Sequence, residues 1–415
     1  MDRRAFLTGT LAALSLGACS GRHAPTVSSP APDARFAALA GLCAGVPPIA
    51  PAERARRRAA AQDLLQRAGL SALLLEAGDA LRYFTGVGWG RSERPLLYAL
   101  PAAGRPIFVV PAFEARTLQE RLEDPDVALV PWQEHESPYA LLAGALAGPR
   151  LAVDPWTRQF VVDGARAAGK ADLVPATDLL RALRSIKSPA ELALLRRATE
   201  ATKAALRAAA SHVSEDMSET DLAGLVHQAQ AAAGLTNTWA LVLFGANASF
   251  PHGTRGERRL RRGDLILVDA GGALHDYQSD VTRTWPFGPV SAAQASAWQA
   301  VHAAQTAALA ELRPGRACEA ADAAARRAIA AAGHGDGYAR FTHRLGHGIG
   351  LQTHEDPYLV RGNAELLRPG MTMSNEPGVY IPGELGVRLE DIVAITDGEP
   401  EVFGPRAAAI DAPFG

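Results

Sequence analysis

Acidic side chains inside apolar or glycine-rich segments are the feature that most limits how this chain can fold. Four acids and one histidine of this kind are spread over its last third: Asp269, Asp280, His347, Glu376 and Glu390. Each lies in a short segment of strand-like character, where a lone ionised carboxylate is costly to bury unless a cation neutralises it. The pattern therefore predicts a buried pair of metal ions.

The two aspartates lie on segments that resemble neighbouring strands. Asp269 ends the apolar run from Leu265 to Val268 and is followed by an Ala-Gly-Gly turn signal. Asp280 begins a segment whose β-branched alternation places Asp280 and Thr282 on one face. We expect two adjacent strands with facing acids.

The two glutamates stand at the ends of further strands. Glu376 is followed by a Pro-Gly turn, which stops its strand. Around Glu390, period-two alternation sends Arg388 to the same side as the glutamate. We therefore expect Arg388 to be the cation beside Glu390.

The histidine pair His343 and His347 superficially resembles a zinc-protease helix. That motif needs a glutamate directly after its first histidine, where this chain has Arg344, and the alternate glycines at 346, 348 and 350 disfavour a helix. A strand or loop is the better interpretation. Any one of these histidines alone would more often be structural, but with His354 three of the eleven histidines fall within twelve residues. Glycines between them allow close backbone approach to a ligand, which favours function.

The blocks LVDAGG, DVTRTW, HRLGHGIGLQTHEDP, MSNEPGVYI and VRLEDIV, in this order, resemble the metal-dependent pita-bread peptidases of family M24B, which include aminopeptidase P and prolidase. The resemblance covers roughly residues 55 to 405 and is strongest from Asp264 onward. It implies an N-terminal α/β domain like that of creatinase and prolidase, and a C-terminal α+β pita-bread catalytic domain. It also implies a small peptide as substrate, cleaved at an Xaa-Pro bond in a dipeptide or at the N-terminus of a longer peptide.

The resemblance assigns a role to each matching position. Asp269 would chelate one metal ion, Asp280 and Glu390 would bridge both, and His347 and Glu376 would complete the other. The residues that match positions around the substrate and the tetrahedral intermediate are His252, His343, His354 and Arg388. Each ligand position of the family pattern is retained.

The ligand types indicate the metal and the chemistry. Oxygen-rich sites with one imidazole suit harder divalent ions, so Mn²⁺ is our first expectation, with Co, Zn, Fe or Mg as alternatives. Two ions about 3.5–4 Å apart would activate a bridging water and polarise the scissile carbonyl. We expect Glu376 to carry the proton to the leaving nitrogen, and His354 or His343 to stabilise the oxyanion.

Other functions on the same scaffold remain open. One is a related hydrolase or lyase acting on a non-peptide substrate, and another is a metal-free binding scaffold. The complete ligand set argues against the metal-free alternative. A methionine aminopeptidase is disfavoured by the large first domain.

Length and composition predict the domain organisation. A chain of 415 residues exceeds one core, so we expect a domain at 52–184, where apolar runs alternate with helical segments, and another at 185–405, with a tail at 406–415. The junction includes Ser188, the expected N-cap of a long helix. Lys and Arg number 42 against 44 Asp and Glu, which gives no reason to expect a nucleic-acid partner.

The first nineteen residues have the features of an export signal. Arg3 and Arg4 precede an apolar stretch too short to span a bilayer, as in twin-arginine signals. The segment from Leu16 to Cys19 resembles a lipobox. We expect a periplasmic protein attached to the membrane only through a lipid at Cys19; the alternative is cleavage near Ala18 and a soluble product. Residues 20–51, rich in proline, predict a flexible tether.

Two further expectations concern assembly and thiols. The resemblance implies a homodimer, in which the glycine-spaced loop holding Trp89 and Arg91 could reach a neighbouring active site; local packing of Trp89 is the alternative. Cys43 and Cys318 have no context that suggests pairing, so no disulfide is expected.

Overall fold

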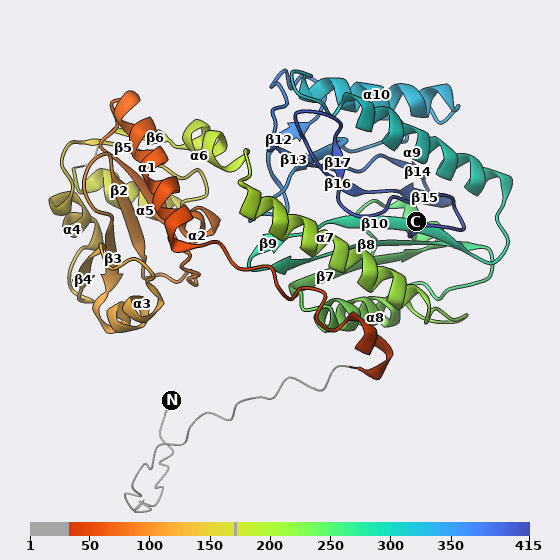
Figure 1. Ribbon diagram of the computed structural model, residues 1–415, viewed down its shortest axis with the longest axis horizontal. Helices are drawn as coiled ribbons and strands as arrows, with labels where there is room; N and C mark the ends of the chain where they lie inside the picture. The colour runs from red at the N-terminus through yellow and green to blue at the C-terminus, as the bar shows by residue number, and fades with distance from the viewer. Residues whose placement is uncertain (1–32, 170–171) are drawn as a thin grey trace, which may run out of the picture.

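The computed structural model describes residues 33–169 and 172–415, which form two domains side by side (Figure 1). The predicted export signal and the lipid-attachment site at residue 19 lie outside the described residues. Within the described part of the chain, no helix is both long and apolar enough to cross a membrane.

The N-terminal domain is a mixed six-stranded sheet with helices packed around it, as predicted. The strand order is β4-β3-β2-β1-β5-β6, with β1–β2 and β2–β3 antiparallel and the other pairs parallel. The strands are β1 Ala72–Glu76, β2 Leu97–Pro101, β3 Ile107–Pro111, β4 Ala128–Trp132, β5 Arg150–Val153 and β6 Asp172–Pro175. The helices are α1 Pro51–Arg67, α2 Asp79–Thr85, η2 Ala112–Glu114, α3 Ala115–Arg121, α4 Pro138–Ala145, α5 Gln159–Ala167 and α6 Thr177–Arg184.

A four-residue junction separates α6 from α7, the first helix of the catalytic domain. Ser188 is the N-cap of α7 (Pro189–Ala210), and it forms a capping box with Glu191: the serine side chain accepts from the Glu191 backbone N–H, and the glutamate accepts from the Ser188 N–H. The predicted helix start is therefore confirmed, and two backbone donors at this end of the helix are satisfied.

The catalytic domain places two sheets and a hairpin between two helix pairs (Figure 1). The first sheet has the order β10-β8-β7, with β9 paired to β8; the second has the order β12-β11-β13-β16-β17; β14 pairs with β15. Its strands are β7 Thr236–Phe244, β8 Asp264–Leu274, β9 Tyr277–Gln278, β10 Val281–Phe287, β11 Gly346–Gly348, β12 Glu355–Leu359, β13 Thr372–Asn375, β14 Gly378–Ile381, β15 Leu385–Arg388, β16 Asp391–Ala394 and β17 Glu401–Val402. Its remaining helices are α8 Glu219–Ala232, η3 Gly245–Ser249, α9 Ala292–Glu311 and α10 Cys318–Ala331.

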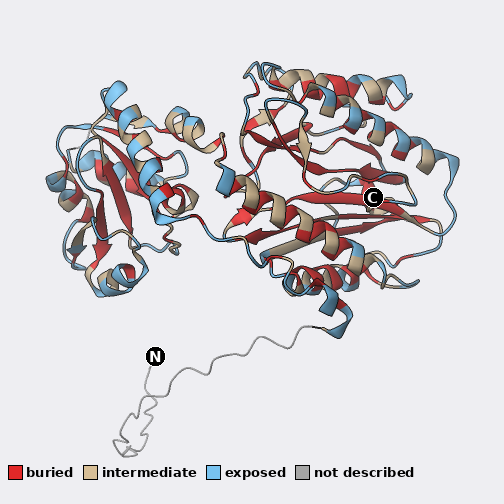
Figure 2. Cartoon of the chain, in the orientation of Figure 1, coloured by how far each residue is buried: buried red, intermediate tan, exposed pale blue. Residues whose placement is uncertain are grey.

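The strands are buried and the outer faces of the helices are exposed (Figure 2). Helix α7 packs on β8 and α8 on β7, whereas α9 packs on β15 and α10 on β12. Because helices cover the faces of the sheets, polar side chains can meet at the ends of the strands.

The N-terminal segment corrects one prediction. Residues 20–51 are expected to form a tether. Residues 20–32 lie outside the described part of the chain, but from residue 33 η1 (Ala34–Leu39) and the chain up to α1 pack on the catalytic domain: Phe36 is completely buried, and the Cys43 N–H bonds to the Ala233 carbonyl. Sparse apolar side chains such as Phe36 and Ile49 hold this proline-rich stretch in place. The tail at 406–415 also folds back, with Phe414 against the ring of Trp285.

Candidate metal centre

The two predicted aspartates lie on the first sheet. Asp269 is in β8 and pairs across the ladder with Thr282 of β10, and Asp280 immediately precedes that strand. Gly271 makes the close approach possible, because a Cβ there would lie 2.1 Å from the carbonyl oxygen of Ser279.

The other three predicted ligands come from the second sheet. His347 is the middle residue of β11, Glu376 follows β13, and Glu390 precedes β16. The ladder pairs Asn375 with Asp391, so the two glutamates stand at the same end of adjacent strands. The backbone hydrogen bond from the Glu390 N–H to the Thr282 carbonyl, at 3.0 Å, joins the two sheets at this point.

The fold thus brings together donors that are more than 100 residues apart in the chain. Three sets have ligand atoms that all lie within 4.8 Å of one another: Asp269, Asp280 and Glu390; His347, Glu376 and Glu390; and Asp280, His347 and His354. The first two sets contain all five predicted ligands and share Glu390.

Unpartnered atoms at this centre test whether a cation fits. Asp269 Oδ1, His347 Nε2 and Glu390 Oε1 are buried and have no hydrogen-bond partner among the described residues. The Nδ1 of His347 lies 3.0 Å from the carbonyl oxygen of Gly348 and must donate to it. In the neutral ring, Nε2 therefore carries a lone pair that faces two carboxylates, at 3.1 Å from Glu376 Oε1 and 3.7 Å from Asp280 Oδ2. The Nε2 lone pair and the neighbouring carboxylate oxygens are all acceptors, and such a group of atoms fits a site for metal ions.

Electrostatics lead to the same conclusion. Burial, followed by the neighbouring carboxylates, raises the pKa of Asp280 well above its ordinary value, and the same causes raise the pKa of Glu390. Without a cation these groups would resist ionisation. A pair of divalent ions would remove that penalty, so the donor set of carboxylate oxygens and one imidazole fits oxygen-preferring metals.

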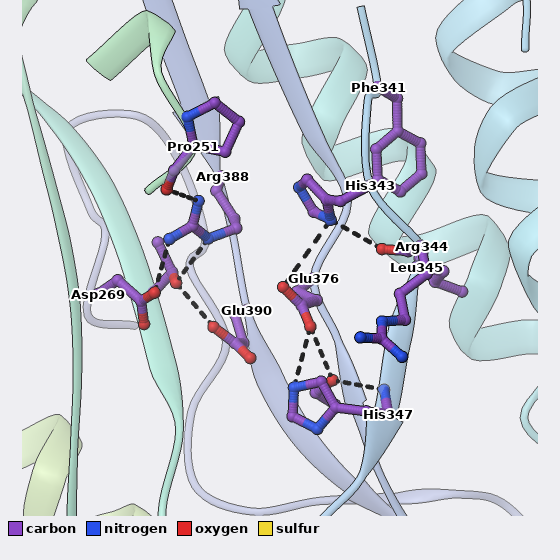
Figure 3. A network of polar contacts seen from close by, with 12 residues as sticks. Pro251, Asp269, Phe341, His343, Arg344, Leu345, His347, Glu376, Arg388 and Glu390 are labelled. Carbon is purple, nitrogen blue, oxygen red and sulfur yellow. Dashed lines mark hydrogen bonds and ion pairs between the residues drawn. The ribbon is translucent and has the colours of Figure 1, made fainter. Parts of the chain in front are cut away.

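Arg388 lies beside Glu390 as predicted, but its ion-pair partner is Asp269. Its Nη2 donates to Asp269 Oδ2 at 2.6 Å, and its Nη1 donates to the Pro251 carbonyl at 3.2 Å (Figure 3). Glu390 instead accepts from Thr282 Oγ1 at 2.7 Å. Strand alternation correctly predicts the shared face: Arg388 Nε donates to Thr282 Oγ1 at 3.1 Å, and this hydroxyl bonds to Glu390. The direct ion pair forms with Asp269 because the guanidinium reaches the first sheet.

Glu376 lies between His343 and His347 (Figure 3). Ser374 Oγ donates to Glu376 Oε1 at 3.1 Å and accepts from the His347 backbone N–H at 3.0 Å. The Nδ1 of His343 lies 4.0 Å from Glu376 Oε2. The general acid-base candidate is therefore positioned by a buried serine that sequence reasoning missed.

Tyr380 is a second residue that was missed. The Nδ1 of His343 donates to the Arg344 carbonyl at 2.8 Å, so its Nε2 accepts from Tyr380 O–H at 2.9 Å; the tyrosine oxygen in turn accepts from Arg388 Nη1 at 3.0 Å. Burial lowers the pKa of His343 to about 4, which keeps the ring neutral. The only sequence signal was a tyrosine in an otherwise apolar strand directly after the Pro-Gly turn.

A cleft of about 350 Å³ opens onto these groups. Its lining includes the five predicted ligands, the substrate-binding candidates His252, His343, His354 and Arg388, and an apolar wall from Trp239 and Leu241 of β7. Trp89 packs against the hydrophobic core and lies under the guanidinium of Arg121, while Arg91 bonds to the carbonyls of Ala77 and Trp156. Neither residue lines this cleft in its own chain.

Comparisons with known proteins agree with the two-domain architecture. Residues 57–186 match the Creatinase/Prolidase N-terminal domain, and residues 193–397 match Metallopeptidase family M24. The chain is 36% identical over 349 residues to a protein named probable dipeptidase PepE of Mycobacterium tuberculosis, covering 83% of this chain and 92% of that one.

Solved structures show the same similarity. The dipeptidase PepE from Mycobacterium ulcerans superposes with a TM-score of 0.83 at 36% identity, covering 88% of this chain and 99% of that one. A prolidase from Thermococcus sibiricus superposes with a TM-score of 0.77 at 30% identity, covering 84% of this chain and 96% of that one.

Proposed function

This chain belongs to metallopeptidase family M24, and on that premise we propose that it is a dinuclear-metal peptidase that cleaves Xaa-Pro bonds in small peptides. The observation that carries the proposal is the meeting of five ligand side chains from two sheets, three of them with unpartnered buried atoms. Ionised carboxylates gathered in a buried site are costly unless cations compensate them, which supports the proposal.

The proposed metal ligands divide into two overlapping groups. Asp269, Asp280 and Glu390 would hold one ion, and His347, Glu376 and Glu390 the other, with Asp280 also close to His347. Manganese is our first choice, because four carboxylates and a single imidazole form a hard donor set. When bound, the ions would supply an activated water nucleophile and polarisation of the scissile carbonyl.

Glu376 is the proposed proton carrier. Its side chain is mostly buried, and its Oε1 already accepts from Ser374, so the carboxylate is held in one orientation at the cleft wall. In that position it would accept the proton of the attacking water and deliver it to the nitrogen of the leaving residue.

The imidazole of His354 is the proposed oxyanion donor. Its ring is exposed to the cleft, lies 3.9 Å from the ring of His347 between centroids, and forms no hydrogen bond within the described residues. A free N–H at this position can bond to the carbonyl oxygen as negative charge develops on it. His343, by contrast, has both nitrogens engaged, so we assign it to the wall of the cleft, with the buried Tyr380 supporting it from behind.

Arg388 and His252 are proposed to face the leaving residue. Three donors of Arg388 are directed to Asp269, Pro251 and Tyr380, which holds the guanidinium rigidly at the cleft. The preference for proline rests on similarity to the prolidase of Thermococcus sibiricus. The amide before proline lacks an N–H, so its cleavage requires no acceptor for that group.

The test compares an Xaa-Pro dipeptide, an Xaa-Pro-Xaa tripeptide and a matched Xaa-Ala dipeptide. Protein stripped with EDTA is assayed before and after addition of Mn²⁺, and metal content is measured by mass spectrometry. We expect two ions per chain and metal-dependent release of the residue before proline. Cleavage of the alanine peptide alone would refute the proline preference, and full turnover without metal would refute the whole proposal.

We also propose export with a twin-arginine signal, lipid attachment at Cys19 and a periplasmic location. The paired arginines and the lipobox-like Leu16 to Cys19 support it. Labelling with radioactive palmitate tests the attachment, with Cys19→Ser as control. We further propose a homodimer, as the resemblance implies, to be tested by light scattering of the chain from residue 33 onward.

A further inference from the structure

The loop that carries His354 has little backbone support of its own. It connects β11 to β12, and neither Thr353 nor His354 forms a hydrogen bond within the described residues. Gly350 and Leu351 offer their carbonyls to Gln278, and the Gly350 N–H bonds to the Gln352 carbonyl, but all of these bonds precede the histidine. An exposed imidazole on such a loop needs another restraint to hold one position during catalysis.

One guanidinium supplies contacts on both sides of the histidine. Arg184 Nη2 donates to Gln352 Oε1 at 3.2 Å and to Glu355 Oε2 at 2.6 Å. Gln352 is two residues before His354, and Glu355 directly follows it. The Arg184 side chain is 11% exposed and that of Glu355 is 7% exposed, so this ion pair is shielded from solvent.

Lys187 completes the attachment from the domain junction. Its Nζ donates to Glu355 Oε1 at 2.7 Å, and its backbone N–H bonds to the Gly370 carbonyl at 2.8 Å. Both oxygens of Glu355 are therefore bound by cations from outside the loop. Gly350 makes room for this carboxylate, because a Cβ at that position would lie 2.5 Å from Glu355 Oε1.

Arg184 is the last residue of α6 in the N-terminal domain, outside the segment that matches the catalytic family. Helix α6 extends toward the end of the catalytic domain where β12 lies (Figure 1). A hollow of about 90 Å³ at this junction is lined by Arg184, Gln352, His354 and Glu355 together. The contact therefore links one domain to a side chain in the active cleft of the other.

We propose that Arg184 is a positioning residue for His354: through Gln352 and Glu355, the N-terminal domain holds the imidazole in its catalytic position. The proposal rests on the proposed function, because it assigns His354 a part in peptide cleavage. Its consequence is that the N-terminal domain contributes to turnover within its own chain. The metal ligands do not depend on this contact.

Arg184→Met is the principal test, and Arg181→Met is its matched control. Arg181 lies one turn earlier on α6 and also reaches the catalytic domain, at Glu365, but it does not touch the His354 loop. We expect Arg184→Met to lower kcat roughly 10- to 100-fold, because a catalytic group misplaced by about 1 Å can cost about 100-fold. Metal content should stay at the wild-type value, and KM should change by less than about threefold. Arg181→Met should retain wild-type kcat.

A double-mutant cycle with His354→Ala separates positioning from a general structural role. If Arg184 acts through His354, Arg184→Met should have no further effect on kcat once the imidazole is absent. Hydrogen exchange of the peptide covering residues 350–358 should be faster in Arg184→Met and unchanged in Arg181→Met. Arg184→Lys, which keeps the charge but loses the forked donors, should give an intermediate kcat and serves if the methionine variant does not fold.

Four results would overturn the proposal. Three of them are multiplicative effects of Arg184→Met and His354→Ala on kcat, loss of metal in Arg184→Met, and equal losses of kcat in the Arg181 and Arg184 variants. Full activity of His354→Ala, in an enzyme whose wild type cleaves Xaa-Pro peptides, would also overturn it; that result would remove the oxyanion role of His354 and leave metal-dependent Xaa-Pro cleavage standing. Failure of the wild type to cleave any peptide would instead contradict the proposed function.

Discussion

Asp269 and Arg388 are 119 residues apart in the sequence and form a 2.6 Å ion pair at the centre of the catalytic domain. The pair uses one oxygen of Asp269, while Oδ1 has no partner among the described residues. One carboxylate thus faces an arginine on one side and the candidate metal centre on the other.

Replacing Arg388 with methionine should make folding depend more strongly on metal. Removal of one partner from a buried ion pair typically costs about 3–5 kcal/mol, because the remaining charge is uncompensated. Bound cations would offset part of that cost at Asp269. We expect the difference in Tm between Mn²⁺-loaded and EDTA-treated protein to be larger in Arg388→Met than in the wild type. Equal differences would show that the arginine does not share this charge with the metals.

Alanine at Asp280 or His347 should remove metal and activity together. Asp280 belongs to two of the three ligand sets, and His347 provides the imidazole. Metal content by mass spectrometry and turnover of an Xaa-Pro dipeptide measure the two effects on the same samples. His135→Ala, at an exposed position distant from any ligand set, is the control. A ligand variant with wild-type turnover and no metal would contradict the assignment.

Tyr380→Phe should lower activity while metal binding is retained. The change removes the O–H that donates to His343 and the oxygen that accepts from Arg388. The two lost hydrogen bonds are worth about 1 kcal/mol each, so kcat/KM should fall by up to roughly 30-fold if the whole cost falls on the transition state. Tyr338, which is 41% exposed, provides a matched Tyr→Phe control. Wild-type activity of Tyr380→Phe would show that the tyrosine is not needed to hold His343 and Arg388 in place.

Glu355 should contribute to acid sensitivity. Burial alone would raise its pKa, but Lys187 and Arg184 outweigh burial and lower it below the ordinary value of 4.5. The unfolded chain then binds the proton more tightly than the folded chain, so the contribution of Glu355 to stability is present above pH 4.5 and is lost as pH falls through the folded-state pKa. In metal-free protein, Tm of Glu355→Gln should fall less than that of the wild type between pH 6 and pH 3.5, about one unit below the ordinary pKa of glutamate. The control is Glu384→Gln on the surface; an identical profile for Glu355→Gln and the wild type would contradict the prediction.

Phe36→Ala should destabilise the catalytic domain, although residue 36 precedes both domains. Its ring is completely buried and meets the His212 ring edge-on at 5.6 Å between centroids. Truncation of a buried phenylalanine costs about 3–5 kcal/mol. Denaturant unfolding of the chain from residue 33 onward measures it, with exposed Phe113→Ala as control. No change in unfolding would mean that this segment is a free tether after all.

Much of this molecule is readable from local sequence. The start of α7 follows from Ser188, Pro189 and Glu191, because caps depend on neighbours three residues away. The mixed N-terminal sheet follows from apolar runs separated by helical segments. The candidate ligands follow from the cost of burying a charge: Asp269 or Glu390 within apolar strands already requires a nearby cation.

Other features were decided by contacts between distant segments. Strand alternation predicts that Arg388 and Glu390 share a face. Only the approach of β15 to β8 decides that Arg388 pairs with Asp269 and that Glu390 accepts a hydrogen bond from Thr282. The ion pairs from Arg184 and Lys187 to Glu355 likewise cross the domain junction. Periodicity reports which way a side chain points within its own strand or helix. The surface that the side chain contacts depends on how whole helices and strands pack, and this packing is not determined by the residue's neighbours in the sequence.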